Sequence, residues 1–201
     1  MSAPWAIVPV KAFGVAKQRL STVLNAEQRS RLGKAVAART IDAFATAGAH
    51  VAVVTADRDV ERWAQRRGYQ VVAEHSAMYG AGLNGAVAVG RATATIAFSR
   101  WVAVHADLPL ITVASARVAL EAVDMTHHGV IVPSRDGGTN LLSGPVVSFR
   151  YGPGSFALHH RQMPLADVLV SPNLSIDLDS PSDLAAVRRH SDGAWIEDII
   201  R

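Results

Sequence analysis

The alternation of short apolar runs with longer stretches of helical periodicity constrains this chain more than any other feature. Five runs of four to six residues are rich in valine and are bounded by polar or turn residues, a pattern typical of buried strands. Strands and helices that alternate at this spacing predict βαβ units and a mainly parallel sheet, that is, an α/β fold. The predicted strands are Ala6–Val10, His50–Thr55, Tyr69–Ala73, Trp101–Val104 and Gly129–Pro133.

Capping residues predict where the helices begin, because their side chains accept from backbone N–H groups that the first helical turn leaves unpaired. The last such signal follows a predicted strand, so the segment Leu174–Leu184 is interpreted as a strand and then a helix. The predicted helix starts are Asn25 with Gln28 (ending near Gly48), Asp57 (through Arg67), Thr112 or Ser115 (through Val123), and Ser180 with Pro181 and Asp183; another helix reaches about Phe98.

Length and composition limit the class of protein. The 201 residues suffice for one domain, 1–201, with a substantial core. No apolar stretch reaches the ~18 residues that span a bilayer, and Met1–Trp5 carries no basic segment ahead of an apolar run. The chain has no cysteine, which excludes disulfides and thiolate metal sites. We therefore expect a cytoplasmic protein that does not enter a membrane.

The positive charge is concentrated near the start of the chain. Between residues 11 and 39 only one acidic residue, Glu27, opposes a series of lysines and arginines, which favours an anionic ligand. No aromatic interleaving and no zinc or helix-turn-helix signature supports a nucleic-acid partner, and none is predicted. The cations are Lys11, Lys17, Arg19, Arg29, Arg31, Lys34 and Arg39.

Carboxylates follow two of the predicted strands. Trp101–Val104 ends shortly before Asp107, and Pro109 then prevents the ladder from continuing. Ligands of open α/β sheets bind at the carboxyl ends of the strands, where Asp107 could hold a divalent cation; the alternative is that Asp107 caps the next turn. Asp177 and Asp179 are two residues apart, so on a strand they share one face, where a cation would relieve their repulsion.

Two glycine-rich loops precede predicted helices. Met78–Ala86 opens an alanine-rich helix, and Phe149–Phe156 opens a helix that contains His159 and His160. Glycines let a ligand approach the backbone, and a helix N-terminus favours anions, although a plain turn explains each loop equally well. Between the apolar runs, residues 135–142 are polar and flexible in composition, with Thr139 beside two glycines.

Together, these basic, glycine-rich and acidic segments indicate a site that binds a nucleoside triphosphate with Mg²⁺. Two chemistries stay open, namely transfer of the γ-phosphoryl group and transfer of the nucleotidyl group with loss of pyrophosphate. The P-loop pattern is absent, and no Gly-x-Gly-x-x-Gly follows the first strand. Gly80–Gly85 fits the latter pattern but lies at mid-chain, where a lone match is weak evidence.

Five motifs spread over residues 5 to 190 resemble the phospholactate guanylyltransferases, the CofC/FbiD-type enzymes of coenzyme F-420 biosynthesis. The resemblance implies a single-domain, Rossmann-like nucleotidyltransferase fold with a mainly parallel central sheet and helices on both faces. It also implies GTP, Mg²⁺ and an acceptor that is 2-phospholactate, phosphoenolpyruvate or 3-phosphoglycerate, with a downstream transferase that uses the product. The motifs are Pro9–Lys11 with Ala16–Leu20, His105–Pro109, Gly138–Asn140, Tyr151–Phe156 and Asp177–Leu184.

The resemblance and the charges assign expected roles. Asp107, Asp177 and Asp179 hold Mg²⁺ and, with Lys17, form the catalytic group. Lys11, Lys17 and Arg19 neutralise the triphosphate of GTP, and Leu83, Asn84 and Gly85 contact its base or ribose. By match to the family loops, Thr139, Gly152 and Ser155 bind the acceptor. The paired glycines that the wider superfamily has in its first loop are replaced here by Phe13-Gly14.

Three alternatives stay open at this stage. One is a nucleotidyltransferase with another nucleotide or a sugar-phosphate acceptor, a second is a non-catalytic nucleotide-binding protein of the same fold, and a third is a basic nucleic-acid-binding module. The oligomeric state is open, and a homodimer would fit. His159 and His160 are interpreted as surface or loop-supporting residues, and the four tryptophans as core or interface residues rather than cofactor-stacking groups.

Overall fold

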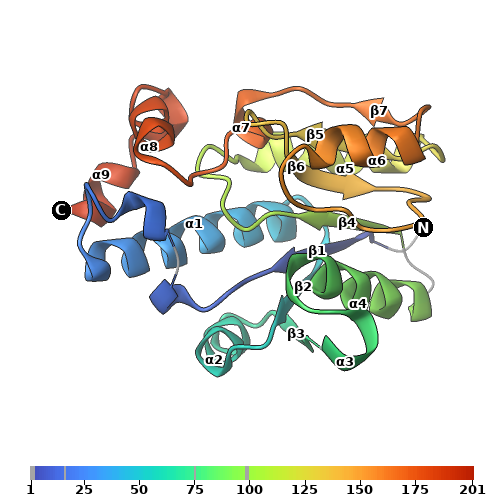
Figure 1. Ribbon diagram of the computed structural model, residues 1–201, viewed down its shortest axis with the longest axis horizontal. Helices are drawn as coiled ribbons and strands as arrows, with labels where there is room; N and C mark the ends of the chain where they lie inside the picture. Colours follow the sequence, from blue (N-terminus) through green and yellow to red (C-terminus); the bar gives the residue numbers. More distant parts are fainter. Residues whose placement is uncertain (1–2, 16, 75, 98–99) are drawn as a thin grey trace.

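Seven strands form one central sheet in the computed structural model, which describes residues 3–15, 17–74, 76–97 and 100–201. The strand order is β3-β2-β1-β4-β6-β5-β7 (Figure 1). All pairs are parallel except those of β6, which runs antiparallel to both β4 and β5, so the prediction of a mainly parallel sheet is confirmed. The strands are β1 Trp5–Pro9, β2 His50–Thr55, β3 Gln70–Ala73, β4 Trp101–Val104, β5 Val130–Pro133, β6 Thr139–Ser143 and β7 Asp167–Val168.

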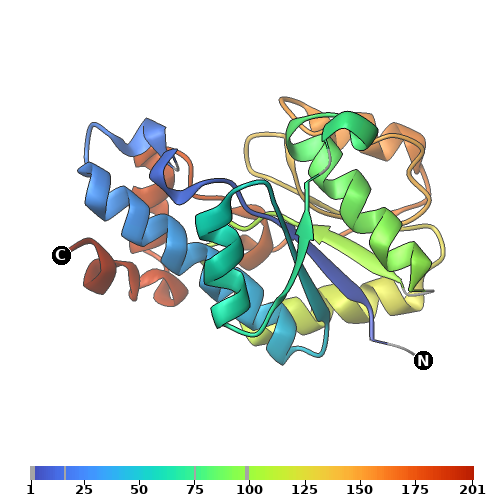
Figure 2. The ribbon, with the colours of Figure 1, turned by 90° about the horizontal axis from the view of Figure 1, so that it is seen from below.

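Helices cover both faces of the sheet (Figure 2). The capping boxes predicted at Asn25 and Ser180 are present, and Asp57 caps α2 as expected. Of the two starts left open for α5, Thr112 is the N-cap, and it forms a capping box with Ser115. The helices are α1 Ala26–Thr46, α2 Arg58–Arg66, α3 Ser76–Tyr79, α4 Gly82–Ile96, α5 Val113–Met125, α6 Ser155–Gln162, α7 Pro172–Ser175, α8 Pro181–Arg188 and α9 Ile196–Ile200, with short 3-10 turns at Phe13–Val15, Gln18–Leu20 and Ser191–Gly193. The predicted end of α4 near Phe98 lies outside the described residues.

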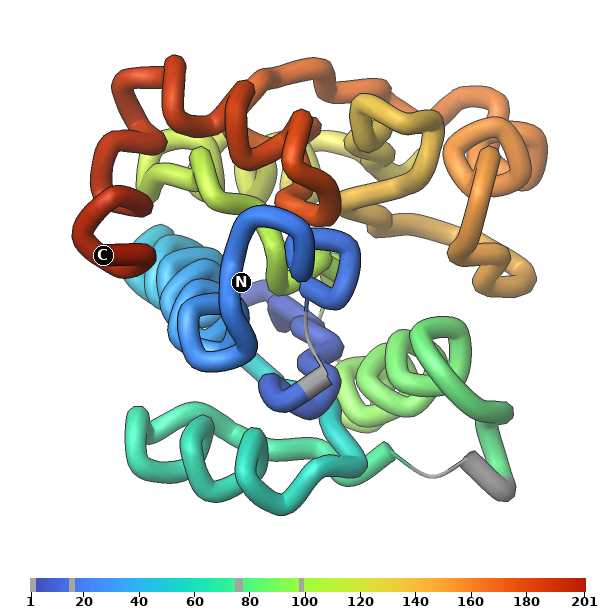
Figure 3. The backbone as a smooth tube through the Cα atoms, turned by 60° about the vertical axis from the view of Figure 1, so that its left-hand side comes forward, coloured from blue at the N-terminus to red at the C-terminus, as the bar shows by residue number. Residues whose placement is uncertain are grey.

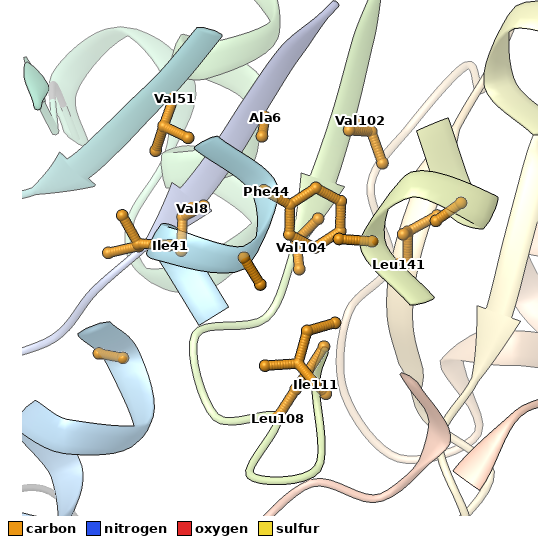
Figure 4. Close-up of a cluster of buried hydrophobic side chains, with 14 of the residues drawn as sticks. Ala6, Val8, Ile41, Phe44, Val51, Val102, Val104, Leu108, Ile111 and Leu141 are labelled. Atoms are coloured by element: carbon orange, nitrogen blue, oxygen red, sulfur yellow. The ribbon is translucent and has the colours of Figure 1, made fainter. Parts of the chain in front are cut away.

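Successive side chains along each strand point to opposite faces of the sheet. Val8 of β1 and Val104 of β4 pack against Phe44 of α1 in a core shared with α2 and α5 (Figure 4). On the opposite face Ile7 packs with α4, and Ile131 packs in a separate cluster with residues beside α6. A fourth cluster joins the amino end of α1 to α8 and α9, so the last helices lie beside the first (Figure 3).

Two expectations from the sequence are wrong. Residues 139–142, expected in a polar flexible loop, belong to β6, because Thr139 and Asn140 are buried and find partners in His159 and the Leu174 carbonyl. Leu174–Asp179 is not a strand, since Pro172 begins the short helix α7 and the chain then runs irregularly to Ser180. Within the described residues, no helix is both long and apolar enough to cross a membrane.

Candidate active site

A cavity of about 520 Å³ opens at the edge of the sheet where β1, β3 and β4 end. Parallel strands direct their following loops to the same edge, which is where ligands of open α/β sheets bind. Because β6 runs the other way, its first residue, Thr139, reaches this edge as well. The cavity therefore has one side built from the loops after β1, β3 and β4, and another built from β6 and the 152–155 loop.

Lys17 lies between two of the predicted metal ligands. Its Nζ donates to Asp107 Oδ2 at 2.9 Å and to Asp179 Oδ1 at 3.2 Å, and its side chain is only 8% exposed. Burial by itself would lower the pKa of Lys17, but the charges of Asp107 and Asp179 outweigh burial and raise it. Burial would likewise raise the pKa of Asp107, yet the Lys17 charge holds it below its usual value. Lys17 has a left-handed backbone (φ 56°), so the fold holds this residue in an uncommon conformation.

The acidic side of the cavity holds more carboxylate than Lys17 neutralises. Burial and the charge of Asp107 raise the pKa of Asp177 to about 7. Asp107 Oδ1 is buried and has no hydrogen-bond partner among the described residues. His105 Nδ1 lies 4.0 Å from that oxygen, but burial lowers the pKa of His105 and so favours the neutral ring. A buried carboxylate oxygen without a partner, beside further carboxylates, fits a hard divalent cation such as Mg²⁺.

The three carboxylates do not by themselves form a finished metal site. Across the described ranges, no cluster of three or more His, Asp or Glu side chains is arranged as a ligand set. Asp107 and Asp179 each face the Lys17 ammonium, and Asp177 and Asp179 lie in an irregular segment on either side of the fully buried Leu178. Their carboxylate oxygens are nonetheless the ligand type that Mg²⁺ prefers.

On the opposite side of the cavity, a buried network fixes the predicted acceptor residues. Thr139 Oγ1 is 3.0 Å from His159 Nδ1, and it accepts from Ser155 Oγ at 3.2 Å. The backbone N–H of Arg150 donates to His159 Nε2 at 3.0 Å. Because that N–H can only donate, Nε2 carries no proton and a neutral ring must donate from Nδ1 to Thr139. The Thr139 hydroxyl proton is then free to donate into the cavity.

Backbone geometry exposes the loop next to this network. Gly152 and Gly154 have positive φ values of 140° and 69°, which a residue with a side chain rarely adopts. Gly154 is the N-cap of α6, and Ser155 is its first residue, with the backbone N–H of Ser155 turned back to the Gly152 carbonyl. The loop therefore presents Gly152 and Ser155 at the cavity with little side-chain bulk between them and a ligand.

Most of the predicted site residues meet in this one cavity. Asn84 and Gly85 do not line it: the Asn84 side chain accepts from the Tyr151 backbone N–H at 2.8 Å, and Gly85 packs tightly against the Gly80 backbone. These two support loops from behind the cavity wall. The predicted site residues that line the cavity are Lys11, Lys17, Arg19, Leu83, Asp107, Thr139, Gly152, Ser155, Asp177 and Asp179.

Three titratable lining residues were assigned no role by the sequence analysis. Glu74 directly follows β3, as Asp107 closely follows β4, so the same strand-end signal could have found it. Asp136 lines the cavity while its carboxylate accepts from the Gly138 backbone, and hydrogen bonding to Ser134 lowers its pKa. His105 begins one of the five motifs but was given no role, because its place depends on burial beside Asp107.

Comparison with known proteins gives close sequence relatives over almost the whole chain. The family model described as "Guanylyl transferase CofC like" matches residues 5–201. A 2-phospho-L-lactate guanylyltransferase of Methanothermobacter thermautotrophicus is 31% identical over 98% of this chain and 89% of its own length. A phosphoenolpyruvate guanylyltransferase of Rubrobacter xylanophilus is 36% identical over 90% and 91%, and a 3-phospho-D-glycerate guanylyltransferase of Phenylobacterium zucineum is 34% identical over 97% and 94%.

Solved structures share the fold at much lower identity. A protein of Desulfovibrio desulfuricans superimposes with a TM-score of 0.73 at 19% identity, over 100% of this chain and 98% of that one. A nucleotidyl transferase of Methanothermobacter thermautotrophicus gives a TM-score of 0.61 at 16% identity, over 94% and 98%. The expected Rossmann-like nucleotidyltransferase fold is thereby confirmed.

Proposed function

Since the chain belongs to the family of CofC-like guanylyl transferases, we propose that it joins GMP from GTP to a phosphorylated three-carbon acid and releases pyrophosphate. The observation that carries this proposal is a single cavity with a carboxylate and lysine group on one side and a set of hydroxyl and backbone donors on the other. The product would pass to a downstream transferase of coenzyme F-420 biosynthesis, the pathway that the family implies.

In the proposed reaction a phosphate oxygen of the acceptor attacks the α-phosphorus of GTP. A new P–O bond forms, the bond from the α-phosphorus to the bridging oxygen breaks, and pyrophosphate leaves with that oxygen. The nucleophile is already an anion near neutral pH, so no base is needed to activate it. The barrier comes from repulsion between two anions and from charge on the leaving group, which positioning and electrostatic stabilisation reduce.

Lys11, Lys17 and Arg19 supply positive charge on the nucleotide side. Lys17 is nearly buried in the cavity wall and is held there by two carboxylates, whereas the other two lining cations, Lys11 and Arg19, are exposed. In this arrangement Lys17 would contact the reacting phosphates, and the two exposed cations would bind the outer phosphates and the pyrophosphate that leaves.

Asp107, with Asp177 and Asp179, would hold Mg²⁺. Two observations support this assignment: Asp107 Oδ1 is buried without a hydrogen-bond partner among the described residues, and burial and the charge of Asp107 raise the pKa of Asp177 to about 7. When bound, the ion would supply charge neutralisation at the phosphates. The carboxylates themselves orient Lys17, whose Nζ they fix from two directions.

Thr139, Gly152 and Ser155 would bind the acceptor. The Thr139 hydroxyl is left with a proton to donate, and a phosphate or carboxylate oxygen in the cavity is a suitable partner. The three relatives named above act on three different acids although they are all about one-third identical to this chain, so similarity alone does not select the acid.

Pyrophosphate release from GTP tests the proposal. The purified protein is incubated with GTP, Mg²⁺ and each of the three acids in turn, with a sample lacking acceptor and one containing EDTA, and with the downstream transferase present to consume the product. Release with one acid, lost in EDTA, supports the proposal and names the acceptor. No release with any acid, from protein that binds GTP, contradicts it. Gel filtration of the purified protein determines the oligomeric state, for which a homodimer is one possibility.

A further inference from the structure

Glu74 lies in the wall of the cavity, yet the proposed reaction gives it no part. It directly follows β3, and its backbone N–H extends the β2–β3 ladder by donating to the Thr55 carbonyl at 3.0 Å. This bond fixes where the side chain begins. The carboxylate of Glu74 is therefore a placed acidic group at the ligand-binding edge of the sheet.

One oxygen of this carboxylate is held in position. Oε1 accepts from the backbone N–H of Gly82, the first residue of α4, at 3.0 Å. Among the described residues Oε2 has no hydrogen-bond partner. The carboxylate is thus oriented by the protein and keeps acceptor capacity for a ligand with two adjacent donors.

The neighbouring wall is apolar. Val54 and Pro9 come from the ends of β2 and β1, and Leu83 and Ala86 come from the first turns of α4, and all four line the same cavity. An apolar wall of this kind suits the face of a planar aromatic ring whose polar edge meets the Glu74 carboxylate. Ligand sites commonly combine apolar walls with a few placed polar groups in this way.

The distance from Glu74 to the phosphate side matches a nucleotide. In the strand order β3-β2-β1-β4, three steps separate the strand before Glu74 from the strand before Asp107, which is about 14 Å at ordinary strand spacing. This is the length scale from the outer edge of a nucleotide base to its phosphates. With the phosphates at Lys17, the base would reach the Glu74 end of the cavity.

We infer that Glu74 selects guanine by accepting hydrogen bonds from its N1–H and its 2-amino group. This inference rests on the proposed function and adds the residue that sets its nucleotide specificity. Guanine presents two adjacent donors on this edge, whereas adenine presents an acceptor at N1 and cytosine an acceptor at N3. A carboxylate only accepts, so it pairs with guanine and repels the other two.

Glu74→Gln separates this role from a structural one. Gln keeps a carbonyl oxygen for the Gly82 N–H, so the start of α4 retains its partner. The amide NH₂ then replaces Oε2, where it opposes the guanine 2-amino group but can donate to the C2 carbonyl of xanthine. A residue that only supports α4 would not change the preference between these two bases.

The measurement is the Kd of GTP, ITP and XTP by titration calorimetry, without acceptor. Wild type should bind GTP at least about tenfold more tightly than ITP, which lacks the 2-amino group, and than XTP. The Glu74→Gln protein should bind GTP about tenfold or more weakly than wild type does, and it should bind XTP more tightly than GTP. The matched control Glu121→Gln, an exposed residue on α5, should keep the wild-type order.

A Glu74→Gln protein that still prefers GTP over XTP would overturn the inference. So would wild type that binds ITP as tightly as GTP, a result that needs no variant and does not depend on how the variant folds. Because binding is measured without acceptor, these outcomes are distinct from failure of the proposed function, which would be absent pyrophosphate release despite selective GTP binding.

Discussion

We predict that the buried His159 makes the free energy of unfolding depend on pH and that it also supports acceptor binding. The ring is fully buried, and both nitrogens are engaged, one by the Arg150 N–H and the other by Thr139. Burial, and next the charge of His105, lower the pKa of His159 to about 4 from its usual 6.5. Protonation would also put a proton on Nε2, which the Arg150 N–H already faces.

The sign of the effect follows from the lowered pKa. The unfolded chain takes up this proton near pH 6.5, whereas the folded chain resists it down to about pH 4, so His159 removes stability as the pH falls between those values. Linkage with these two pKa values gives a loss of about 2 kcal/mol of unfolding free energy at pH 5, relative to neutral pH.

His159→Phe keeps an aromatic ring but cannot titrate or form these bonds. At pH 7.5 it should be about 2–4 kcal/mol less stable than wild type, because Arg150 and Thr139 lose a buried partner. As the pH falls to 5, the difference in unfolding free energy between wild type and His159→Phe should shrink by about 2 kcal/mol, because only the wild-type chain has a titratable ring that is protonated on unfolding. Urea unfolding at four pH values between 7.5 and 5 measures this difference.

A difference that stays constant over this range would refute the reasoning. His128→Phe, at an exposed position, is the control and should track wild type at every pH. Activity supplies a second readout: since His159 orients Thr139 and holds the 150–152 backbone, His159→Phe should raise the KM of the acceptor more than the KM of GTP. An equal rise in both would indicate a general structural role.

Three further changes test other parts of the molecule. Asp107→Asn should lower turnover about a thousandfold while the protein stays folded by circular dichroism, and wild-type turnover would sink its assignment. Ser155→Ala should raise the KM of the acceptor more than that of GTP in steady-state assays, and the reverse would place Ser155 on the nucleotide. Gly90→Ala should destabilise the fold by about 1–3 kcal/mol in urea unfolding, because its Cβ would lie 2.3 Å from Cγ2 of the buried Ile7; an unchanged midpoint would contradict this packing.

Local sequence patterns predicted most strands of the sheet. They failed where buried polar side chains form hydrogen bonds with residues that are distant in the sequence. The five valine-rich runs became five strands because their burial is encoded in their own composition. β6 was missed because Thr139 and Asn140 resemble loop residues, and only the partners that the fold brings to them make them suitable for a buried strand. Leu174–Asp179 shows the opposite error: its alternation resembles a strand, but Pro172 starts a helical turn there.

Residues of the candidate site could be predicted where a functional side chain comes just after a predicted strand or lies within a specific family motif. Asp107 and Ser155 were found in this way, and both line the cavity. Asn84 was predicted from its place in a glycine loop, yet its side chain turns to Tyr151, a contact that no local pattern encodes. The position of Lys17 between two carboxylates also depends on segments 90 and 162 residues away along the chain.

The reversed direction of β6 divides the cavity between two stretches of sequence. The side proposed for the triphosphate comes from the chain before residue 110 and the side proposed for the acceptor from residues 134–155, apart from the late Asp177/Asp179 pair. This division predicts that transplanting the 134–155 segment of a relative named for a different acid transfers the acid preference and leaves the nucleotide preference unchanged. Under this proposal, a change of acceptor requires substitutions in one short stretch and leaves the nucleotide side of the cavity unaltered.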